Sequence, residues 1–117
     1  MSQLTDDIQK NQDVFVNQTQ KGNLVWALCN EQGEFLSVDS TEFEETEVMP
    51  FWSDEQDAVI HCVEEWAEFK PTSFPLDEFV EDWLVSLNDE NVLVGINWNA
   101  ELDGIEMEPK TVVELYL

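Results

Sequence analysis

Positive charge is what this sequence has least of. Its 117 residues include four lysines and no arginine against 27 aspartates and glutamates, so the formal net charge at pH 7 is −23. Because such a chain repels phosphates and anionic lipid headgroups, we expect no direct binding to nucleic acid and none to membranes. A macromolecular partner is expected to be basic or uncharged. The simpler interpretation is that the charge only keeps the protein soluble.

Cysteines and long apolar runs are also scarce. Cys29 and Cys62 are too few for a disulfide framework and do not form a C-x-x-C motif, so we expect both to be reduced and buried. The first residues lack the basic and apolar segments of a signal peptide. No apolar run approaches the roughly 20 residues that a membrane-spanning helix needs. Together these absences predict a cytoplasmic protein.

Recognisable catalytic sets are missing as well. The single histidine, His61, is adjacent to Cys62 in a segment predicted to be helical, and neighbouring helical residues do not face each other. The pair is therefore not expected to act as a base and a nucleophile. No zinc motif, calcium loop or glycine-rich phosphate loop is present. We expect no catalytic residues, no metal and no cofactor, and we lean away from an enzyme.

What the sequence does contain is enough apolar and aromatic material for a core. Aromatic residues make up 11% of the chain, including five tryptophans, which a disordered acidic tail would lack. Helical periodicity and capping signals predict helices over residues 4–20, 53–68 and 76–87, and a last one from Pro109. Ser53 and Gln56 form the capping box of the second helix. The apolar face of the N-terminal segment 1–21 is sparse, so we expect it to pack lightly or to swap onto a partner.

The remaining apolar segments predict strands. Leu24–Leu28 and Phe35–Val38, joined by a turn with Gly33, form an N-terminal β-hairpin. Residues 48–52 form a short strand, and residues 92–98 lack polar alternation, which predicts a central strand covered on both faces. A further strand covers residues 104–108. This interleaved order predicts one domain over residues 1–117, of the α/β (α+β) class, with a mixed β-sheet and about four helices packed on it.

Two groups of residues are candidates for interaction. A cluster of glutamates, together with acids of the preceding hairpin, predicts an exposed anionic face for a basic partner; its members are Glu42, Glu44, Glu45 and Glu47. Trp52, Asn97 and Trp98 follow apolar strands, and ligands of open α/β sheets bind outside the carboxyl ends of strands. An enzyme or small-ligand cleft near Trp52 and Trp98 is therefore the alternative to a protein-interaction domain. Simple solvation of the acids and core packing of the tryptophans are the plainer interpretations.

Four segments also carry a family resemblance. They resemble the bacterial domain of unknown function 2750 family from about residue 14 to the C-terminus; the segments are Val25–Leu28, Met49–Ser53, Leu76–Phe79 with Trp83–Leu84, and Val92–Trp98. The resemblance implies a small cytoplasmic bacterial protein and supplies neither an activity nor site residues. A weaker, fold-level likeness to the N-terminal domain of SseB-type proteins implies a mixed-sheet domain used in protein association. We interpret the chain as an acidic, non-enzymatic protein-interaction domain whose oligomeric state stays open.

Overall fold

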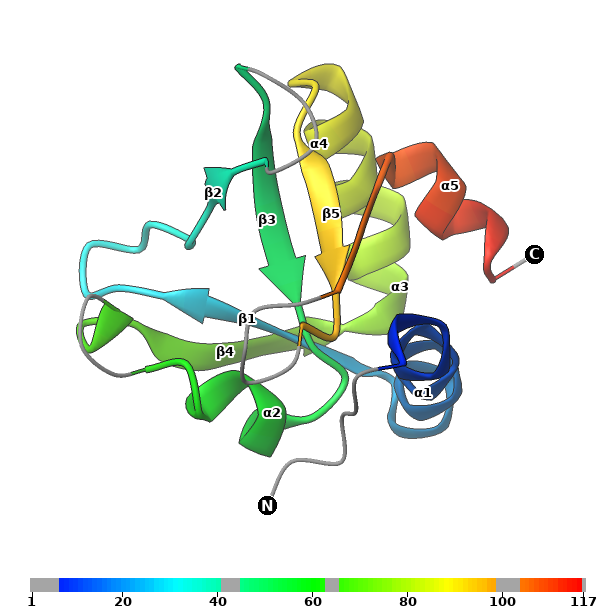
Figure 1. The fold of residues 1–117 in the computed structure, drawn as a ribbon, viewed down its shortest axis with the longest axis horizontal. Coiled ribbons are helices and arrows are strands. Elements are labelled where there is room, and N and C mark those ends of the chain that lie inside the picture. Colours follow the sequence, from blue (N-terminus) through cyan, green and yellow to red (C-terminus); the bar gives the residue numbers. More distant parts are fainter. Residues whose placement is uncertain (1–6, 41–44, 63–65, 99–103, 117) are drawn as a thin grey trace.

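The computed structural model describes residues 7–40, 45–62, 66–98 and 104–116. These residues form a mixed α+β fold, which confirms the predicted class (Figure 1). The elements in chain order are α1 (Ile8–Gly22), β1 (Leu24–Cys29), β2 (Val38–Asp39), β3 (Glu47–Phe51), α2 (Glu55–Val59), β4 (Lys70–Pro75), α3 (Leu76–Glu78), the π-helical turn η2 (Phe79–Trp83), α4 (Leu84–Asp89), β5 (Leu93–Ile96), β6 (Ile105–Met107) and α5 (Pro109–Glu114). Because α3, η2 and α4 are continuous, the described residues contain four helices.

The described strands divide between two sheets rather than forming the single mixed sheet that we expected. One sheet pairs β1 with β4, and the other has the order β2-β3-β5-β6. In the larger sheet β3 and β5 are parallel and the other pairs are antiparallel. Trp26 of β1 and Trp52, just after β3, exchange two backbone hydrogen bonds of 2.8 Å. In the part of the chain that the structure describes, this bridge joins the two sheets.

The predicted N-terminal hairpin is present only at its turn. Asn30 and Glu34 close the turn, Cys29 bridges to Phe35, and the Leu36 N–H donates to the Leu28 carbonyl. After that point the chain leaves β1 and forms β2 against β3. The long partner of β1 is β4, which pairs with all six of its residues. The strand that pairs along β1 is therefore the segment around Pro71 and Pro75, and not residues 35–38 as the sequence predicts.

Pro50 lies where β3 changes its neighbour. The Phe51 carbonyl accepts from Asn97 on the β5 side, whereas Val48 pairs with β2 and Trp52 pairs with Trp26. Since backbone polar groups alternate sides along a strand, Pro50 faces the gap between β2 and β1. A proline, which has no N–H to donate, fits this interior strand only at such a gap.

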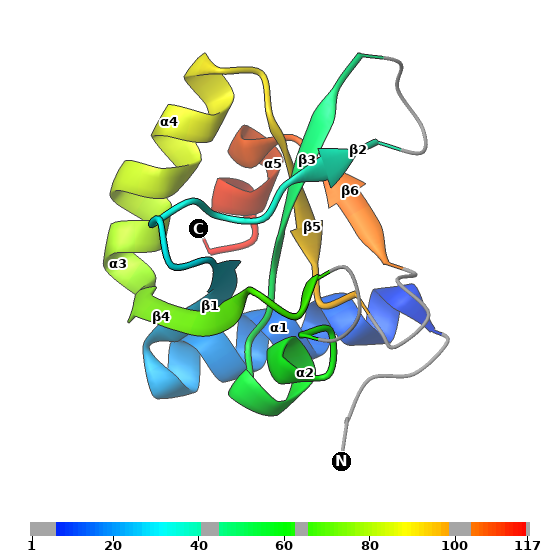
Figure 2. The same cartoon turned by 90° about the vertical axis from the view of Figure 1, so that its left-hand side faces the viewer.

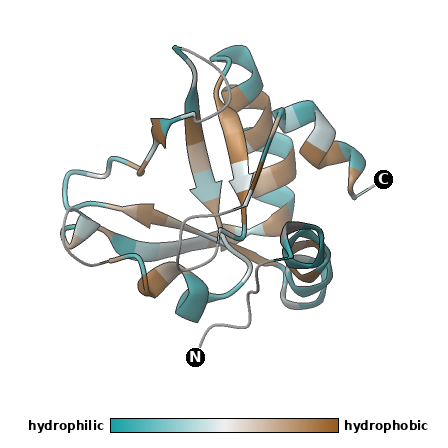
Figure 3. Ribbon diagram, viewed as in Figure 1, coloured by the Kyte–Doolittle hydropathy of each residue, from teal (hydrophilic) through white to brown (hydrophobic). Residues whose placement is uncertain are grey.

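The larger sheet carries a hydrophobic core on each face. Figure 2 shows α3 and α4 on one side of β3 and β5, and Figure 3 colours parts of both strands as hydrophobic. Val94 and Ile96 of β5 contribute to the core that includes Phe15, Phe51 and Phe79. The other core consists of Leu28, Leu36, Val48, Trp52, Ala58 and Trp98, with partly buried residues around it. Strand β5 is therefore central and covered on both faces, as its sequence predicts.

Helix α1 packs more closely than its sparse apolar face predicts. Asn11, Phe15 and Thr19, spaced one turn apart, are all 1% exposed or less. The Thr19 hydroxyl donates to the Phe15 carbonyl and lies 2.7 Å from the Tyr116 hydroxyl oxygen. Hydrogen-bonded polar residues thus complete a buried face that a count of apolar residues misses.

The ends of α1 also differ from the prediction. Its N-cap is Asp7, whose carboxylate accepts from the Lys10 N–H at 3.1 Å, so the helix begins at Ile8 and not at residue 4. The helix includes Gly22, and the left-handed residue that ends it is Asn23, with φ 57°. Asparagine is one of the few residues that adopt this conformation readily.

Helix α2 is much shorter than the predicted helix 53–68. Asp54, and not Ser53, is its N-cap, and the Asp54 carboxylate accepts from the Gln56 N–H at 2.8 Å. The His61 and Cys62 N–H groups donate to carbonyls three residues back, so the chain tightens and leaves the helix. Cys29 and Cys62 have free thiols and are half-buried, so the expected full burial was wrong.

The continuous helix from α3 to α4 confirms the clearest helical prediction. It buries Phe79, Leu84 and Leu87, and the half-buried Trp83 stacks on Phe74 with ring centroids 4.8 Å apart. Helix α5 begins with Pro109 in its first turn, as predicted. Within the described ranges, no helix is both long and apolar enough to cross a membrane.

Candidate functional site

The carboxyl ends of β3 and β5 bring Trp52, Asn97 and Trp98 together, but as a closed cluster. Trp52 and Asn97 are 0% exposed and Trp98 is 5% exposed. The Trp52 indole N–H donates to the Trp98 carbonyl at 2.9 Å, and the Trp98 indole N–H donates to the Ile105 carbonyl at 3.2 Å. The single N–H donor of each indole is therefore hydrogen-bonded within the protein.

Asn97 holds the ends of the two strands and α1 together. Its side-chain carbonyl accepts from the Ser53 N–H at 3.0 Å, and its amide donates to the Asn11 carbonyl at 3.1 Å and to the Ser53 hydroxyl at 3.0 Å. Its backbone is left-handed, with φ 44°. Asparagine tolerates this conformation, and the contacts made by its buried amide show why this residue stands here.

Two glycines make room for the Trp98 indole. A Cβ on Gly95 would lie 2.6 Å from one indole carbon, and a Cβ on Gly104 would lie 2.2 Å from another. Neither distance is possible without movement, because the interior is already close-packed. The Val-Gly-Ile-Asn-Trp segment is therefore a packing motif, in which Gly95 seats the tryptophan three residues later.

His61 closes the same cluster from the end of α2. Its ring lies 5.0 Å from the Trp52 ring and 6.0 Å from the Trp66 ring, between centroids. Its Nε2 lies 3.3 Å from the Trp98 carbonyl oxygen, which can only accept, so this nitrogen carries the proton. Burial lowers the pKa of His61, against the opposing effects of that carbonyl and of the Asp57 carboxylate. The histidine is thus a neutral, buried packing residue at neutral pH.

The acidic cluster is only partly within the described residues. Glu45 and Glu47 are exposed, as predicted, and Glu42 and Glu44 lie outside the described ranges. Glu31, Glu34 and Asp39 of the preceding segment are also exposed. The described acids between β1 and β3 therefore face solvent.

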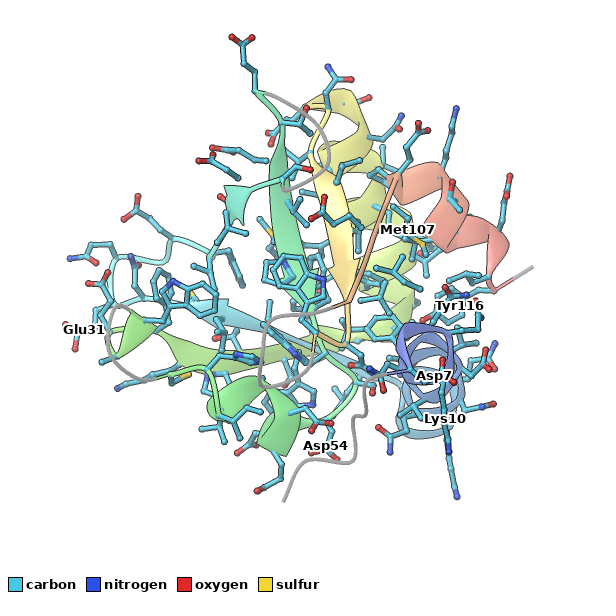
Figure 4. All side chains as sticks on the ribbon, in the orientation of Figure 1. Asp7, Lys10, Glu31, Asp54, Met107 and Tyr116 are labelled. Carbon is cyan, nitrogen blue, oxygen red and sulfur yellow. The ribbon has the colours of Figure 1, made fainter. Side chains whose placement is uncertain are left out.

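A groove of about 880 Å³ opens at the other end of the larger sheet, where β5 begins. Half-buried apolar residues at the start of β5 and in β6 line it, and these are Val92, Leu93 and Met107. Glu106 and Glu108 provide carboxylates, and Pro109 begins α5 beside them. Figure 4 labels Met107 at this end of the molecule and Asp54, before α2, at the opposite end. We call this feature the β5–β6 groove.

The surroundings of the β5–β6 groove are acidic. The lining residue Thr46 lies between Glu45 and Glu47 in sequence, and lining residues Asn88 and Asn91 bracket Asp89 and Glu90. These four acids are exposed. Among the lining residues, all in the described part of the chain, Lys110 is the only cation, and its ammonium lies 3.3 Å from a Glu108 carboxylate oxygen.

The sequence did not single out any residue of this groove. Sequence patterns place Glu106 in the predicted strand 104–108 and Pro109 at the start of a helix, and neither pattern indicates a groove. The groove depends on how the ends of β3, β5 and α4 meet the β6–α5 junction, and no local spacing encodes that meeting. The weak signal was Glu106 and Glu108 flanking Met107, one pattern among many in a chain with 27 acids.

The described residues contain no group of three or more metal-ligating side chains placed to hold an ion. The fold and its groove define a small, acidic α+β domain with one closed and one open end to its main sheet. The chain belongs to the family described as Protein of unknown function (DUF2750), whose model matches residues 12–115. No curated protein matches the chain.

Proposed function

We propose that this protein is a cytoplasmic, non-enzymatic interaction domain of bacterial type, which binds a basic protein through its acidic surface. The observation that carries the proposal is the set of exposed acids in the segment between β1 and α2, which contains no lysine or arginine. Residues 22–69 contain no lysine or arginine, and the described acids Glu31, Glu34, Asp39, Glu45 and Glu47 are exposed. A field of one sign attracts oppositely charged partners and disfavours like-charged ones.

Folding gives no reason to keep these acids charged. Each is solvated, and their mutual repulsion opposes the compact state. Glutamine or asparagine would serve equally well at such positions, and the chain uses both elsewhere. Retention of charge where it opposes folding supports a role in binding.

The alternative, an enzyme or ligand cleft at Trp52 and Trp98, has less support. A ligand-binding tryptophan offers its face or its N–H to the ligand, and both indoles are buried with their donors used internally. Opening this cluster would expose a hydrophobic core.

The test is affinity capture with identification of the bound proteins over a range of salt concentrations. The test variant replaces the acidic cluster with glutamine at Glu42, Glu44, Glu45 and Glu47. The control removes the same number of charges from exposed sites elsewhere, as Glu55→Gln, Glu68→Gln, Glu78→Gln and Glu81→Gln. We expect a basic protein that is retained by the wild type and the control, released by salt, and weakly retained by the test variant. Equal retention by all three proteins would contradict the proposal.

A further inference from the structure

We propose that the β5–β6 groove binds an arginine-containing extended segment of the basic partner. The inference rests on the proposed function. It names the site where a basic side chain of the partner makes direct contacts, in addition to the long-range attraction by the acidic surface. The groove lies where β5 begins, and the Trp52–Trp98 cluster lies where β3 and β5 end. Figure 1 shows β3 and β5 side by side and running in the same direction, so these two places are at opposite ends of the larger sheet.

The size of the groove suits a peptide segment. About 880 Å³ is near the upper end of the range for sites that take small ligands or a few amino-acid side chains. It is bordered by elements from four parts of the chain: the start of β3, the end of α4, the start of β5 and the β6–α5 junction. Because these parts of the chain are packed together by the core of the domain, the shape of the groove is fixed by the fold.

The lining matches an arginine side chain in both of its parts. Leu93 is half-buried and can cover an aliphatic stem. It lies on the same face of the sheet as Glu106, because it is two residues from Gly95, which pairs with Glu106. Val92 and Met107 pack against the core on the opposite face. Glu106 and Glu108 supply oxygen acceptors for a guanidinium, whose fork of donors fits carboxylates. An arginine buries its stem on apolar surface while its charged head stays with polar groups.

The protein's own lysine shows that a cation is accepted here. Lys110 lies 3.3 Å from Glu108, and both side chains are largely exposed, at 72% and 58%. An exposed pair of this kind contributes little to stability, so a partner's guanidinium can replace it at small cost. The four exposed acids beside the groove (Glu45, Glu47, Asp89 and Glu90) add a field of the same sign.

The groove variant is Glu106→Gln/Glu108→Gln, which removes charge and keeps the shape and the acceptor oxygen that the Ser40 hydroxyl uses at Glu106. The matched control is Glu55→Gln/Glu68→Gln, which removes two charges from exposed positions outside the groove. The probe is a short peptide of alternating arginine and serine, compared with the same peptide carrying citrulline in place of arginine.

Amide NMR shifts during titration of the full chain provide the first readout. We expect shifts concentrated at Leu93, Met107 and Thr111, and an affinity about tenfold lower for the groove variant, which equals about 1.4 kcal/mol. The control variant should bind like the wild type, and the citrulline peptide should bind weakly. Shifts spread over all acidic surfaces, an equal loss in the control, no binding, or equally tight binding of spermine at the same amides would overturn the inference.

Capture of the natural partner separates this inference from the proposed function. A partner that is lost with the acidic-cluster variant but retained by the groove variant leaves the proposed function standing and overturns the groove. A partner that both variants retain in full overturns both.

Discussion

The two ends of the larger sheet are built in opposite ways. The space where β3 and β5 end is filled by Trp52, Asn97, Trp98 and His61, whose polar groups are hydrogen-bonded inside the protein. Where β5 begins, half-buried apolar residues and carboxylates line an open groove. Ligands of open α/β sheets usually bind at the carboxyl ends of strands. In this protein that end is filled by buried side chains.

The sequence predicted the elements better than it predicted their partners. The helix from Leu76 and the central strand at Val94 follow from strong local periodicity, and both are present. The pairing of β1 with β4 joins residues far apart in the chain, and a hairpin turn at Gly33 pointed to the nearer strand instead. Helix α2 ended early because His61 turns into the tryptophan cluster, a tertiary contact that overrides helical propensity.

For the candidate site, the sequence likewise identified the residues but not how their side chains are arranged. The sequence identified Trp52, Asn97 and Trp98 as a group, since each follows an apolar strand, and the structure brings them together. It could not indicate that the indoles face inward, because burial depends on Gly95, Gly104 and the position of α2. The exposure of Glu45 and Glu47 follows directly from their charge.

The largest effect is expected at the closed end. Trp52→Ala removes a fully buried indole and leaves the Trp98 carbonyl without one of its donors. We expect a loss of about 3–5 kcal/mol in the free energy of unfolding, measured by denaturant titration. The control is Val85→Ala, since Val85 is 54% exposed and should change stability by less than about 0.5 kcal/mol. A Trp52 variant as stable as the wild type would show that the closed end is not part of the core.

A smaller loss is expected from Gly95→Ala. The new methyl group would lie 2.6 Å from the Trp98 indole, so the ring must shift in a packed environment. We expect about 1–3 kcal/mol of destabilisation, the usual range for overpacking. Gly22→Ala is the matched control, because nothing lies within 4 Å of its added Cβ. If both variants melt alike, then Gly95 is not needed to seat Trp98.

The closed end should also respond to acid through His61. Its unfolded form takes up a proton near pH 6.5, whereas burial lowers the pKa of the folded form. Between these values the unfolded state binds more protons, so the contribution of His61 falls as the pH falls below 6.5. We expect the stability of the wild type relative to His61→Phe to decline from about pH 7 to about pH 5. A constant difference, measured by denaturant titration at each pH, would contradict a neutral buried histidine.

The smallest effect on stability is expected at the open end. Glu106→Gln/Glu108→Gln keeps the acceptor for the Ser40 hydroxyl and removes an exposed ion pair with Lys110. We therefore expect the free energy of unfolding to change by less than about 0.5 kcal/mol, since exposed pairs contribute little and repulsion among the acids is relieved. Ser40→Ala measures the hydrogen bond separately. A loss above about 2 kcal/mol in the glutamine variant would mean that these carboxylates hold the fold. The contrast between a closed, structural end and an open, ligand-binding end would then be wrong. Carboxylates that are needed for folding cannot give up their hydrogen bonds within the protein to bind a ligand without a loss of stability.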